Sequence, residues 1–167
     1  MYNIGIIGAG KVGVSLGRYL LGLDYTNLVG YYSRSLDSSA YAAKVTNSGK
    51  FTSIEKLVEK SNVILITTPD DQISEIWSTI SKFSIQNKIV CHCSGSLSSE
   101  IFFDISSKGA SGCSMHPILA ISSKENSYKD LSSAFFTLEG QDKAIEFFSR
   151  VLDSKRNKYK VLSKTEK

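Results

Sequence analysis

The residues whose types and spacing best suit binding chemistry form a glycine-rich turn, Gly8-Ala9-Gly10-Lys11-Val12-Gly13. A β-branched run at residues 3–8 leads into the turn, and apolar residues at helical spacing follow it. In such a turn the first glycine permits the tight bend, the second lets the backbone approach a pyrophosphate, and the third lets the helix lie close to the strand. The free N–H groups and the dipole at a helix N-terminus both favour negative charge. We predict a dinucleotide site made by Gly8, Ala9, Gly10, Lys11, Val12 and Gly13; the alternative is a tight connection that binds nothing.

The residues after the second expected strand indicate which dinucleotide is bound. Asp or Glu at this place would hold the 2′-hydroxyl of NAD, but the sequence is Ser33-Arg34-Ser35, with no carboxylate before Asp37. Arg34 can bind a 2′-phosphate by a charge-assisted contact, and the hydroxyls of Ser33 and Ser35 can add hydrogen bonds. We predict NADP as the cofactor, with NAD less favoured. The alternative is a solvated arginine on a surface loop.

A third strand end lies at Thr67-Thr68-Pro69. The apolar run at residues 63–67 has no alternation, which is typical of a strand covered on both faces. Ligands of open α/β sheets collect at the carboxyl ends of strands, so Thr67, Thr68 and Pro69 are expected to line the cofactor cleft. Asp70 and Asp71 follow, where a helix would begin. We favour the interpretation that they cap this helix over a contact with ligand.

Two further strand ends carry candidates for catalysis. His116, in Met115-His116-Pro117, is predicted to transfer a proton or to donate a hydrogen bond to a substrate oxygen. A structural histidine before a proline turn is the alternative. Ser94 ends the preceding strand and is the second catalytic candidate. Ser94 and Ser96 either bind substrate or cap the element that follows.

No metal site is predicted. Cys91, Cys93, Cys113 and His116 could in principle form a zinc set. However, Cys91 and Cys93 point to one face of a buried strand, where free cysteine commonly serves as a small hydrophobe. Their spacing also departs from that of zinc pairs, and three cysteines favour reduced thiols over a disulfide framework.

These strand ends must be brought together by regular elements. Strands are predicted at residues 3–8, 28–33, 63–67, 88–93, 112–116 and 134–138, and a last short strand at 159–162 is left open. Helices are predicted between them, one of which contains Ile101, Phe102 and Ile105 and ends at Gly109, while residues 118–132 indicate a loop. Alternating strands and helices indicate βαβ units. We predict an α/β fold, a doubly wound, mostly parallel Rossmann-type sheet with helices on both faces in three layers.

The composition limits the class of protein. The chain has 167 residues and a mass of 18.3 kDa, which is about one domain. With 41% hydrophobic and 22% charged residues it is typical of a globular protein. No apolar run approaches the roughly 18 residues of a membrane helix, and no basic region of a secretory signal precedes the first strand. A cytoplasmic protein with no membrane partner is expected.

The net charge of +4 comes from one end of the chain. Residues 153–167 hold six Lys or Arg and two Asp or Glu, and the rest of the sequence is balanced. A basic end could touch nucleic acid, but charge clusters are usually solvated. No nucleic-acid partner is expected.

Several of these motifs together resemble a known superfamily. They are Gly-Ala-Gly-x-Val-Gly at residues 8–13, Ser-Arg-Ser at 33–35, Thr-Pro-Asp-Asp-x-Ile at 68–73, His-x-Ser-Gly-Ser-Leu at 92–97 and His-Pro at 116–117. The set resembles the NADP-binding half of the 6-phosphogluconate and 3-hydroxyisobutyrate dehydrogenases, pyrroline-5-carboxylate reductase and prephenate dehydrogenase. It is most similar to a branch in which a Rossmann-like NADP oxidoreductase domain precedes a helical domain of unknown function.

The resemblance covers about residues 3–162 and implies an NADP-dependent oxidoreductase. Such an enzyme transfers hydride between nicotinamide and a small carbonyl, imine or hydroxyl substrate. In prephenate dehydrogenases the His of His-Pro contacts the substrate hydroxyl and a Ser precedes it, at positions similar to His116 and Ser94. The Lys usually found two residues after that Ser is Ser96 here, which argues against prephenate as the substrate.

In the hydroxyacid dehydrogenases of the superfamily, the catalytic Lys and Asn lie on the helical domain. We therefore expect residues 1–162 to form an NAD(P)-binding domain and residues 163–167 to form a basic tail that leads to an absent C-terminal helical domain. The full-length protein would be a homodimer with a small-molecule substrate. A dinucleotide sensor without catalysis is the alternative, because a fold alone does not establish a reaction.

Overall fold

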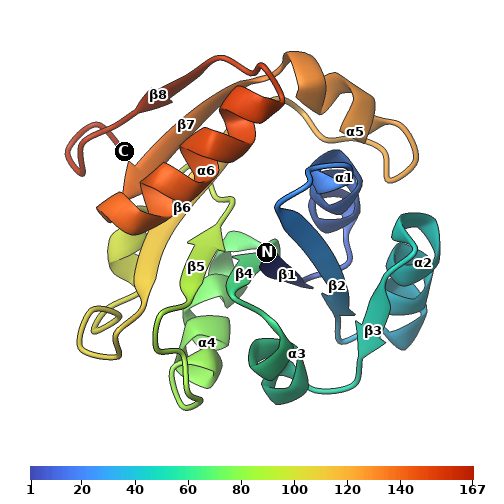
Figure 1. Ribbon diagram of the computed structural model, residues 1–167, viewed down its shortest axis with the longest axis horizontal. Helices are drawn as coiled ribbons and strands as arrows, with labels where there is room; N and C mark the ends of the chain where they lie inside the picture. Colours follow the sequence, from blue (N-terminus) through green and yellow to red (C-terminus); the bar gives the residue numbers. More distant parts are fainter.

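Eight strands form one sheet in the order β3-β2-β1-β4-β5-β6-β7-β8, in a computed structural model that describes residues 1–167 (Figure 1). The strands are β1 (Tyr2–Ile7), β2 (Thr26–Tyr32), β3 (Gly49–Phe51), β4 (Val63–Ile66), β5 (Ile89–His92), β6 (Ser111–Ile118), β7 (Phe135–Gly140) and β8 (Tyr159–Val161). All neighbouring strands run parallel except β6 and β7, which are antiparallel. The predicted, mostly parallel sheet is confirmed.

Helices cover both faces of the sheet (Figure 1). One face carries α1 (Lys11–Leu20), α2 (Leu36–Thr46) and α6 (Asp142–Ser154), and the other carries α3 (Ile54–Lys60) and α4 (Asp70–Ile80). The first face encloses a core of 24 buried residues and the second a core of 13. Because β4 lies between both cores, all four of its residues are apolar and buried. The three-layer, doubly wound fold is therefore confirmed. None of the helices combines the length and the apolar character needed to cross a lipid bilayer.

The order of the strands reverses beside β1. The chain leaves β1 through α1 to reach β2 on one side, and it arrives at β4 on the other side through α3, on the opposite face. The connections diverge at this point, so a crevice opens outside the carboxyl ends of β1 and β4. The glycine turn after β1 and Thr67 after β4 therefore lie side by side.

Helix α1 approaches β2 closely because Gly17 has no side chain. A Cβ atom at Gly17 would overlap the hydroxyl oxygen of Tyr31 on β2. This hydroxyl is buried without a hydrogen-bond partner, and burial raises the pKa of Tyr31 to about 12. The contact fixes the distance between α1 and the sheet, and thereby the position of the glycine turn.

We expect Gly17→Val to lower the free energy of unfolding by about 1–3 kcal/mol, because the added methyl groups must push α1 away from β2. Tyr31→Phe alone should cost less than about 1 kcal/mol, because the hydroxyl that it removes has no partner. Chemical denaturation followed by Trp77 fluorescence measures both values. A Gly17→Val variant as stable as the unmodified chain would contradict the close packing.

The sequence prediction of a helix through Ile101, Phe102 and Ile105 is wrong. The chain forms only a 3₁₀ turn, η1 (Ser99–Ile101), and then irregular turns. Asp104 has a φ of 68°, in the left-handed region, which interrupts helical geometry. Phe102 and Ile105 are nevertheless buried. Their apolar side chains therefore indicate that this segment packs into the core, and not that it is helical.

Short elements account for the other differences. Residues 118–132 are not wholly a loop, because β6 extends to Ile118 and the segment contains α5 (Ser127–Asp130) and the start of the 3₁₀ turn η2 (Leu131–Ser133). The three-residue strand β3 was not predicted. The sequence left open whether residues 159–162 form a strand, and the structure contains β8 at this place. One turn or three residues is too short to show a hydrophobic period.

Candidate functional site

A cleft of about 190 Å³ lies in the crevice at the carboxyl ends of β1, β2 and β4. It is lined by Ile7, Gly8, Ala9, Gly10, Tyr32, Ser33, Arg34, Thr67, Thr68, Pro69, Gln72, Glu75 and Ile76. Eight of the residues predicted to bind cofactor are thus brought together from three separate strand ends. Gln72, Glu75 and Ile76 come from α4 and were missed, because nothing in the helical pattern distinguishes them.

A second hollow of about 400 Å³ continues past the N-terminus of α1. It shares Gly10, Thr67, Thr68 and Pro69 with the first cleft and adds Lys11, Val12, Asp70, Cys93, Ser94 and Ile121. The two hollows together form one elongated site along the carboxyl edge. An elongated site of this kind suits a ligand with two linked halves.

The three motif glycines have different roles in the turn. Gly8 has a φ of 107°, and its carbonyl oxygen accepts a hydrogen bond from the Thr67 hydroxyl at 2.9 Å. A Cβ atom at Gly13 would overlap that same carbonyl, so Gly13 is needed for packing. A Cβ atom at Gly10 would meet no atom within 4 Å. The structure itself therefore gives no reason for glycine at position 10.

The space over Gly10 is suited to a phosphate group. Gly10 is the N-cap of α1, makes no side-chain capping hydrogen bond, and no acidic residue lies in the first turn. The first N–H groups of the helix are therefore available to an anion. The Thr68 hydroxyl, which lines both hollows, is buried without a hydrogen-bond partner. A pyrophosphate linking two nucleosides would fit both the open N-terminus and the unpaired hydroxyl.

Arg34 and its two serine neighbours are placed differently. Ser33 and Arg34 line the cleft, and Arg34 takes part in no ion pair. The Ser35 hydroxyl instead accepts a hydrogen bond from the backbone N–H of Ser38 at 3.2 Å and caps α2. Ser33 and Arg34 can thus face a ligand in the cleft, whereas the structure uses Ser35 to begin a helix.

The hydroxyl of Ser94 is fully occupied by neighbouring groups. It donates to a carboxylate oxygen of Asp70 at 2.7 Å and accepts from the N–H groups of Ser96 and Leu97, each at 3.1 Å. The Ser96 hydroxyl donates to the same Asp70 oxygen at 2.9 Å. The interpretation of Asp70 as a helix cap is wrong, because Pro69 is the N-cap of α4 and the Asp70 side chain joins the turn after β5. Ser94 therefore shapes this turn.

His116 contacts Cys93, which lines the second hollow, and keeps one ring nitrogen free. Its Nδ1 lies 3.2 Å from the carbonyl oxygen of Cys93, which can only accept, so Nδ1 carries the proton and Nε2 of the neutral ring keeps its lone pair. A Cβ atom at Gly95 would lie 2.8 Å from Nε2, so this glycine makes room for the ring. His116 does not itself line either hollow; it adjoins the second one through Cys93.

The segment after His116 closes one side of the site. Ile121 lines the second hollow opposite Val12. The Ser15 hydroxyl donates to the carbonyl of Ser123 at 3.3 Å, and a guanidinium nitrogen of Arg18 donates to the carbonyl of Glu125 at 2.8 Å. We call residues 119–126 the strap. It is fastened to α1 by these two hydrogen bonds and to α2 by a hydrogen bond from the Tyr41 hydroxyl to the Glu125 carboxylate at 3.1 Å.

Residues 1–117 match the family described as Rossmann-like domain. The chain belongs to this Rossmann-like domain family. No curated protein sequence matches it. The superfamily and the particular branch suggested by the sequence motifs stay predictions.

Three solved structures illustrate the likeness. A provisionally named NADP oxidoreductase from Bacteroides fragilis superposes with a TM-score of 0.84 at 17% identity, over 99% of this chain and 62% of that one. Prephenate dehydrogenase from Aquifex aeolicus gives 0.81 at 21% identity, over 98% and 62%. Imine reductase from Pseudomonas sp. gives 0.75 at 15% identity, over 97% and 55%. At these identities the likeness is one of fold, and the Rossmann-like chain spans less than two thirds of each relative.

Within this Rossmann-like domain, His92 has a structural role that the sequence did not reveal. The side chain is fully buried; its Nδ1 accepts from the N–H of Ser94 at 3.3 Å, and its Nε2 lies 3.2 Å from the carbonyl of Ser98, to which it donates. The imidazole thus joins both ends of the turn that carries Ser94. Burial is the largest cause that lowers the pKa of His92, so the ring is neutral at pH 7.

The buried neutral ring predicts a pH dependence of stability. The pKa of His92 is lowered on folding from about 6.5, so the unfolded chain binds more protons between the two values. The stability that His92 contributes is full above about pH 6.5 and is lost as the pH falls through the lowered pKa. Urea denaturation of the unmodified chain and of His92→Asn, between about pH 7.5 and about pH 5, tests this. The variant should show the flatter decline, and equal slopes would contradict the assignment.

Cys91 on β5 and Cys113 on β6 lie on the apolar side of the sheet, and Cys93 follows β5 and borders the second hollow. Cys91 and Cys113 are paired neighbours inside the larger core, and burial raises the pKa of the Cys91 and Cys93 thiols. No group of three His, Cys, Asp or Glu side chains is arranged to hold a metal ion. These thiols act here as small apolar groups.

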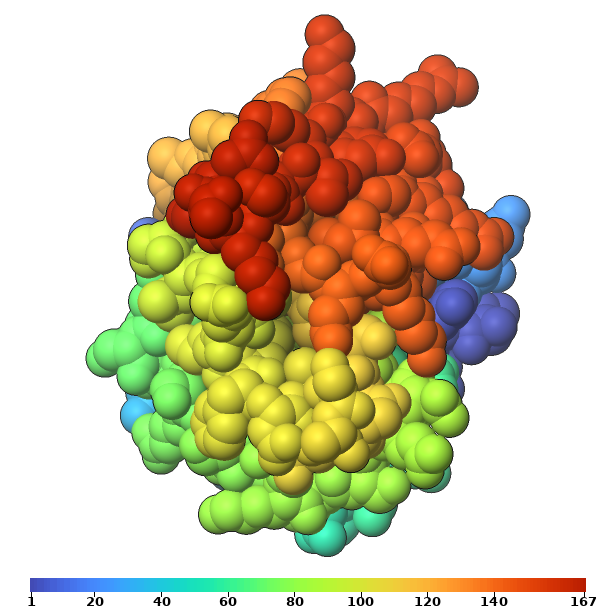
Figure 2. Space-filling view, turned by 90° about the vertical axis from the view of Figure 1, so that its left-hand side faces the viewer, coloured from blue at the N-terminus to red at the C-terminus, as the bar shows by residue number.

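The basic tail at residues 163–167 folds back against the domain. Figure 2 shows the last residues, in dark red, lying beside the yellow-green surface of the segment around residue 100. Lys164 pairs with Glu100 at 3.1 Å, and the Lys167 ammonium donates to the carbonyl of Ser94 at 3.1 Å. The tail thus contacts the turn that borders the second hollow.

Proposed function

We propose that the chain binds NADP(H) along the carboxyl edge of its sheet and forms the cofactor half of an oxidoreductase. The open space above Gly10, at an uncapped helix N-terminus, carries the proposal. Packing requires Gly8 and Gly13 but not Gly10, so a ligand explains the glycine at position 10. Among structures of the same fold, pyrroline carboxylate reductase from Plasmodium falciparum is described with NADP bound.

The preference for NADP over NAD rests on Arg34. Arg34 lines the cleft beside Ser33, and its guanidinium has no carboxylate partner and can make bidentate hydrogen bonds to a 2′-phosphate. No acidic residue of the segment after β2 lines the cleft to receive a ribose 2′-hydroxyl. Glu75 also lines the cleft, but it comes from α4, on the other wall.

The second hollow would take the nicotinamide half and a small substrate. Bound NADPH supplies a hydride, and a carbonyl or imine that accepts it also needs a proton. His116 is the group in this chain that can exchange that proton, because its Nε2 is free while Nδ1 is held by Cys93. Ser94, whose hydroxyl is saturated, supports the turn beside His116 and does not contact substrate through that hydroxyl. Val12, Pro69 and Ile121 give the hollow apolar walls.

The chain spans less than two thirds of its structural relatives, so the complete enzyme is part of the proposal. Residues 1–162 would be the NAD(P)-binding domain, and a further helical part would complete the substrate site and form a homodimer. The second candidate is a dinucleotide sensor. It is favoured by one observation: the hydroxyl of Ser94 is saturated, so one of the two candidate catalytic residues is not available to a substrate.

Titration of the purified chain with NADPH and, in parallel, with NADH tests the proposal. The fluorescence of the reduced nicotinamide reports binding. Tight binding of NADPH and weak binding of NADH are expected. Failure of both to bind would overturn the assignment of the cleft. Once binding is established, a panel of small carbonyl and imine compounds separates the enzyme from the sensor, because only the enzyme oxidises NADPH.

A further inference from the structure

A third hollow, of about 370 Å³, lies apart from the cofactor site. It is lined by Arg18, Tyr19, Tyr128, Lys129, Ser132 and Lys155, and none of these residues lines either cofactor hollow. Its three cations come from α1, from α5 and from the C-cap of α6. The fold thus gathers positive charge from three distant parts of the sequence, and no carboxylate lines the hollow.

The cations of this hollow are held by neutral groups. The Arg18 guanidinium lies 3.8 Å from the centre of the Tyr128 ring and donates to the carbonyl of Glu125. The Lys155 ammonium donates to the carbonyl of Leu21 at 2.7 Å. Partial burial lowers the pKa of Lys155, as expected for a cation without an anion beside it. Arg18 and Lys155 are therefore ordered, but their charges are not neutralised.

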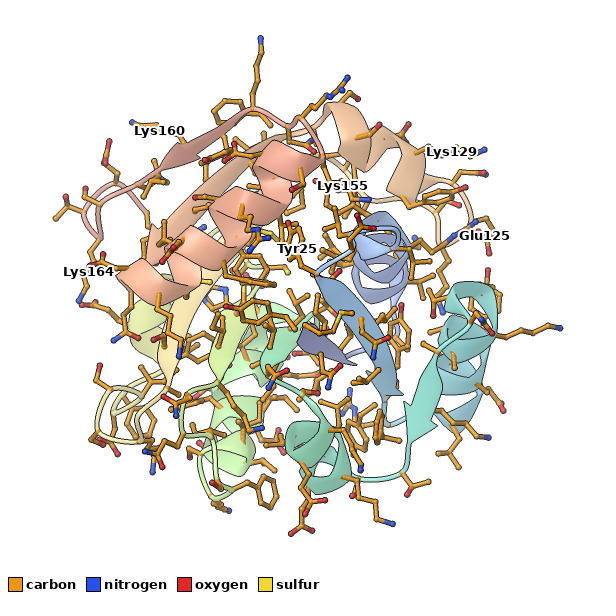
Figure 3. The ribbon with its side chains drawn as sticks, in the orientation of Figure 1. Tyr25, Glu125, Lys129, Lys155, Lys160 and Lys164 are labelled. Atoms are coloured by element: carbon orange, nitrogen blue, oxygen red, sulfur yellow. The ribbon has the colours of Figure 1, made fainter.

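Other lysines of the chain are paired with carboxylates, unlike the cations of this hollow. The structure has three ion pairs, which join Lys108 to Asp104, Lys160 to Glu166 and Lys164 to Glu100. Figure 3 shows Lys160 and Lys164 on the β8 side of the molecule, away from Lys129 on α5 and Lys155 at the end of α6. The basic residues after Asp153 therefore do not all lie on one surface. Lys160 and Lys164 are compensated, whereas Lys155 joins Arg18 and Lys129.

The walls of the hollow are rigid. Beyond the contact of Arg18 with Tyr128, the Tyr19 hydroxyl donates to the side-chain oxygen of Asn157 at 2.6 Å, and the Asn157 amide donates to the carbonyls of Leu131 and Ala134 at 2.7 and 2.9 Å. These bonds connect α1, the segment between α6 and β8, and η2 with the residue that follows it. Cations held on a rigid concave surface bind an anion with little ordering cost.

We propose that this hollow binds the phosphate groups of a small anionic ligand, at a site separate from the cofactor cleft. Arg18 and Lys155 would offer oriented N–H donors, and Lys129, which has no partner, would close on the anion as a mobile charge. The volume lies within the range of small-molecule sites. A hollow of this size favours a free or nucleoside-linked diphosphate over a strand of nucleic acid, which needs a longer basic track.

The test is an amide NMR titration of the full chain with inorganic pyrophosphate and, separately, with ADP, after the cofactor cleft has been saturated with NADPH. Saturable shifts are expected at residues 128–132. Lys129→Ala should weaken binding about tenfold or more, because it removes a charge-assisted contact. The matched control is Lys82→Ala, which removes an exposed lysine beyond α4 and should leave the affinity unchanged.

The two ligands distinguish the source of the phosphate. Equal affinity indicates recognition of the phosphates alone, and tighter binding of ADP indicates that the hollow also receives the nucleoside; both support the site. The proposed site would be overturned if the amide signals of residues 128–132 did not shift. It would also be overturned if Lys129→Ala bound the ligands as tightly as the unmodified chain. Tighter binding of single-stranded RNA than of either ligand at the same residues, with a steep dependence on salt, would also overturn it.

Discussion

Replacing Gly10 with Asp should abolish NADPH binding and leave the fold intact. The backbone of Gly10 has a φ of −79°, which any residue can adopt, and a Cβ atom there would meet no protein atom within 4 Å. The carboxylate would project into the space proposed for the pyrophosphate and repel it. At a few ångströms this repulsion predicts a loss of affinity on the order of 100-fold or more. Fluorescence titration measures the loss, and thermal unfolding should shift by no more than about 2 °C.

The control for this variant is Ser84→Asp, which adds the same charge to the loop between α4 and β5, at the opposite edge of the sheet. It should bind NADPH like the unmodified chain. Unchanged affinity in Gly10→Asp would show that the open space is not a phosphate site. Loss of affinity together with a large drop in melting temperature would show that Gly10 serves packing instead.

Replacing Arg34 with Ala should weaken NADPH about 10-fold to 100-fold and change NADH by less than about twofold. The guanidinium is proposed to bind the 2′-phosphate, which NADH lacks, and one or two charge-assisted hydrogen bonds are worth about 1.5–3 kcal/mol. Because the exposed side chain of Arg34 is bound to no carboxylate, its removal should not affect folding. Parallel titrations with the two nucleotides give both dissociation constants.

Arg34→Lys provides a graded comparison. Lysine keeps the charge but loses the planar pair of donors, so the affinity for NADPH should fall between those of the unmodified chain and Arg34→Ala. Equal losses for NADPH and NADH in Arg34→Ala would contradict recognition of the 2′-phosphate. They would instead indicate that Arg34 packs against the part of the ligand that both nucleotides share.

The fold and the first cleft could be predicted because their signals are local. The glycine spacing, the unbroken apolar run of β4 and the helical period after the turn each reflect the geometry of one element, and alternating elements leave few topologies. Gly8 and Gly13 occupy the places that the motif predicts, at a positive φ and at a close contact. Ser53 caps α3 by accepting from the N–H of Lys56, which is also a local contact.

What could not be predicted depends on contacts between distant segments. Asp70 looked like a helix cap because its neighbours in sequence begin a helix, whereas its carboxylate is used by Ser94 and Ser96, on the adjacent strand end. For Ser94 the sequence left two roles open, substrate binding or capping, and its contact with Asp70 could not be read from its neighbours in sequence. His92 belongs to a motif of the resemblance, but its structural role could not be predicted, because a neutral, buried imidazole is recognised only by the two groups that it joins.

Arg18 belongs at once to the strap and to the basic hollow. It supports the carbonyl of Glu125, in the same strap whose Ile121 lines the cofactor site, and it lines the hollow proposed for a phosphate. If both proposals hold, an anion that draws the guanidinium toward itself would change the support of the strap, and with it the free energy of holding the proposed nucleotide beside Ile121. Such coupling is reciprocal: the factor by which the anion alters the affinity for the nucleotide is also the factor by which the nucleotide alters the affinity for the anion. Through Arg18, the occupancy of either site would then affect the occupancy of the other.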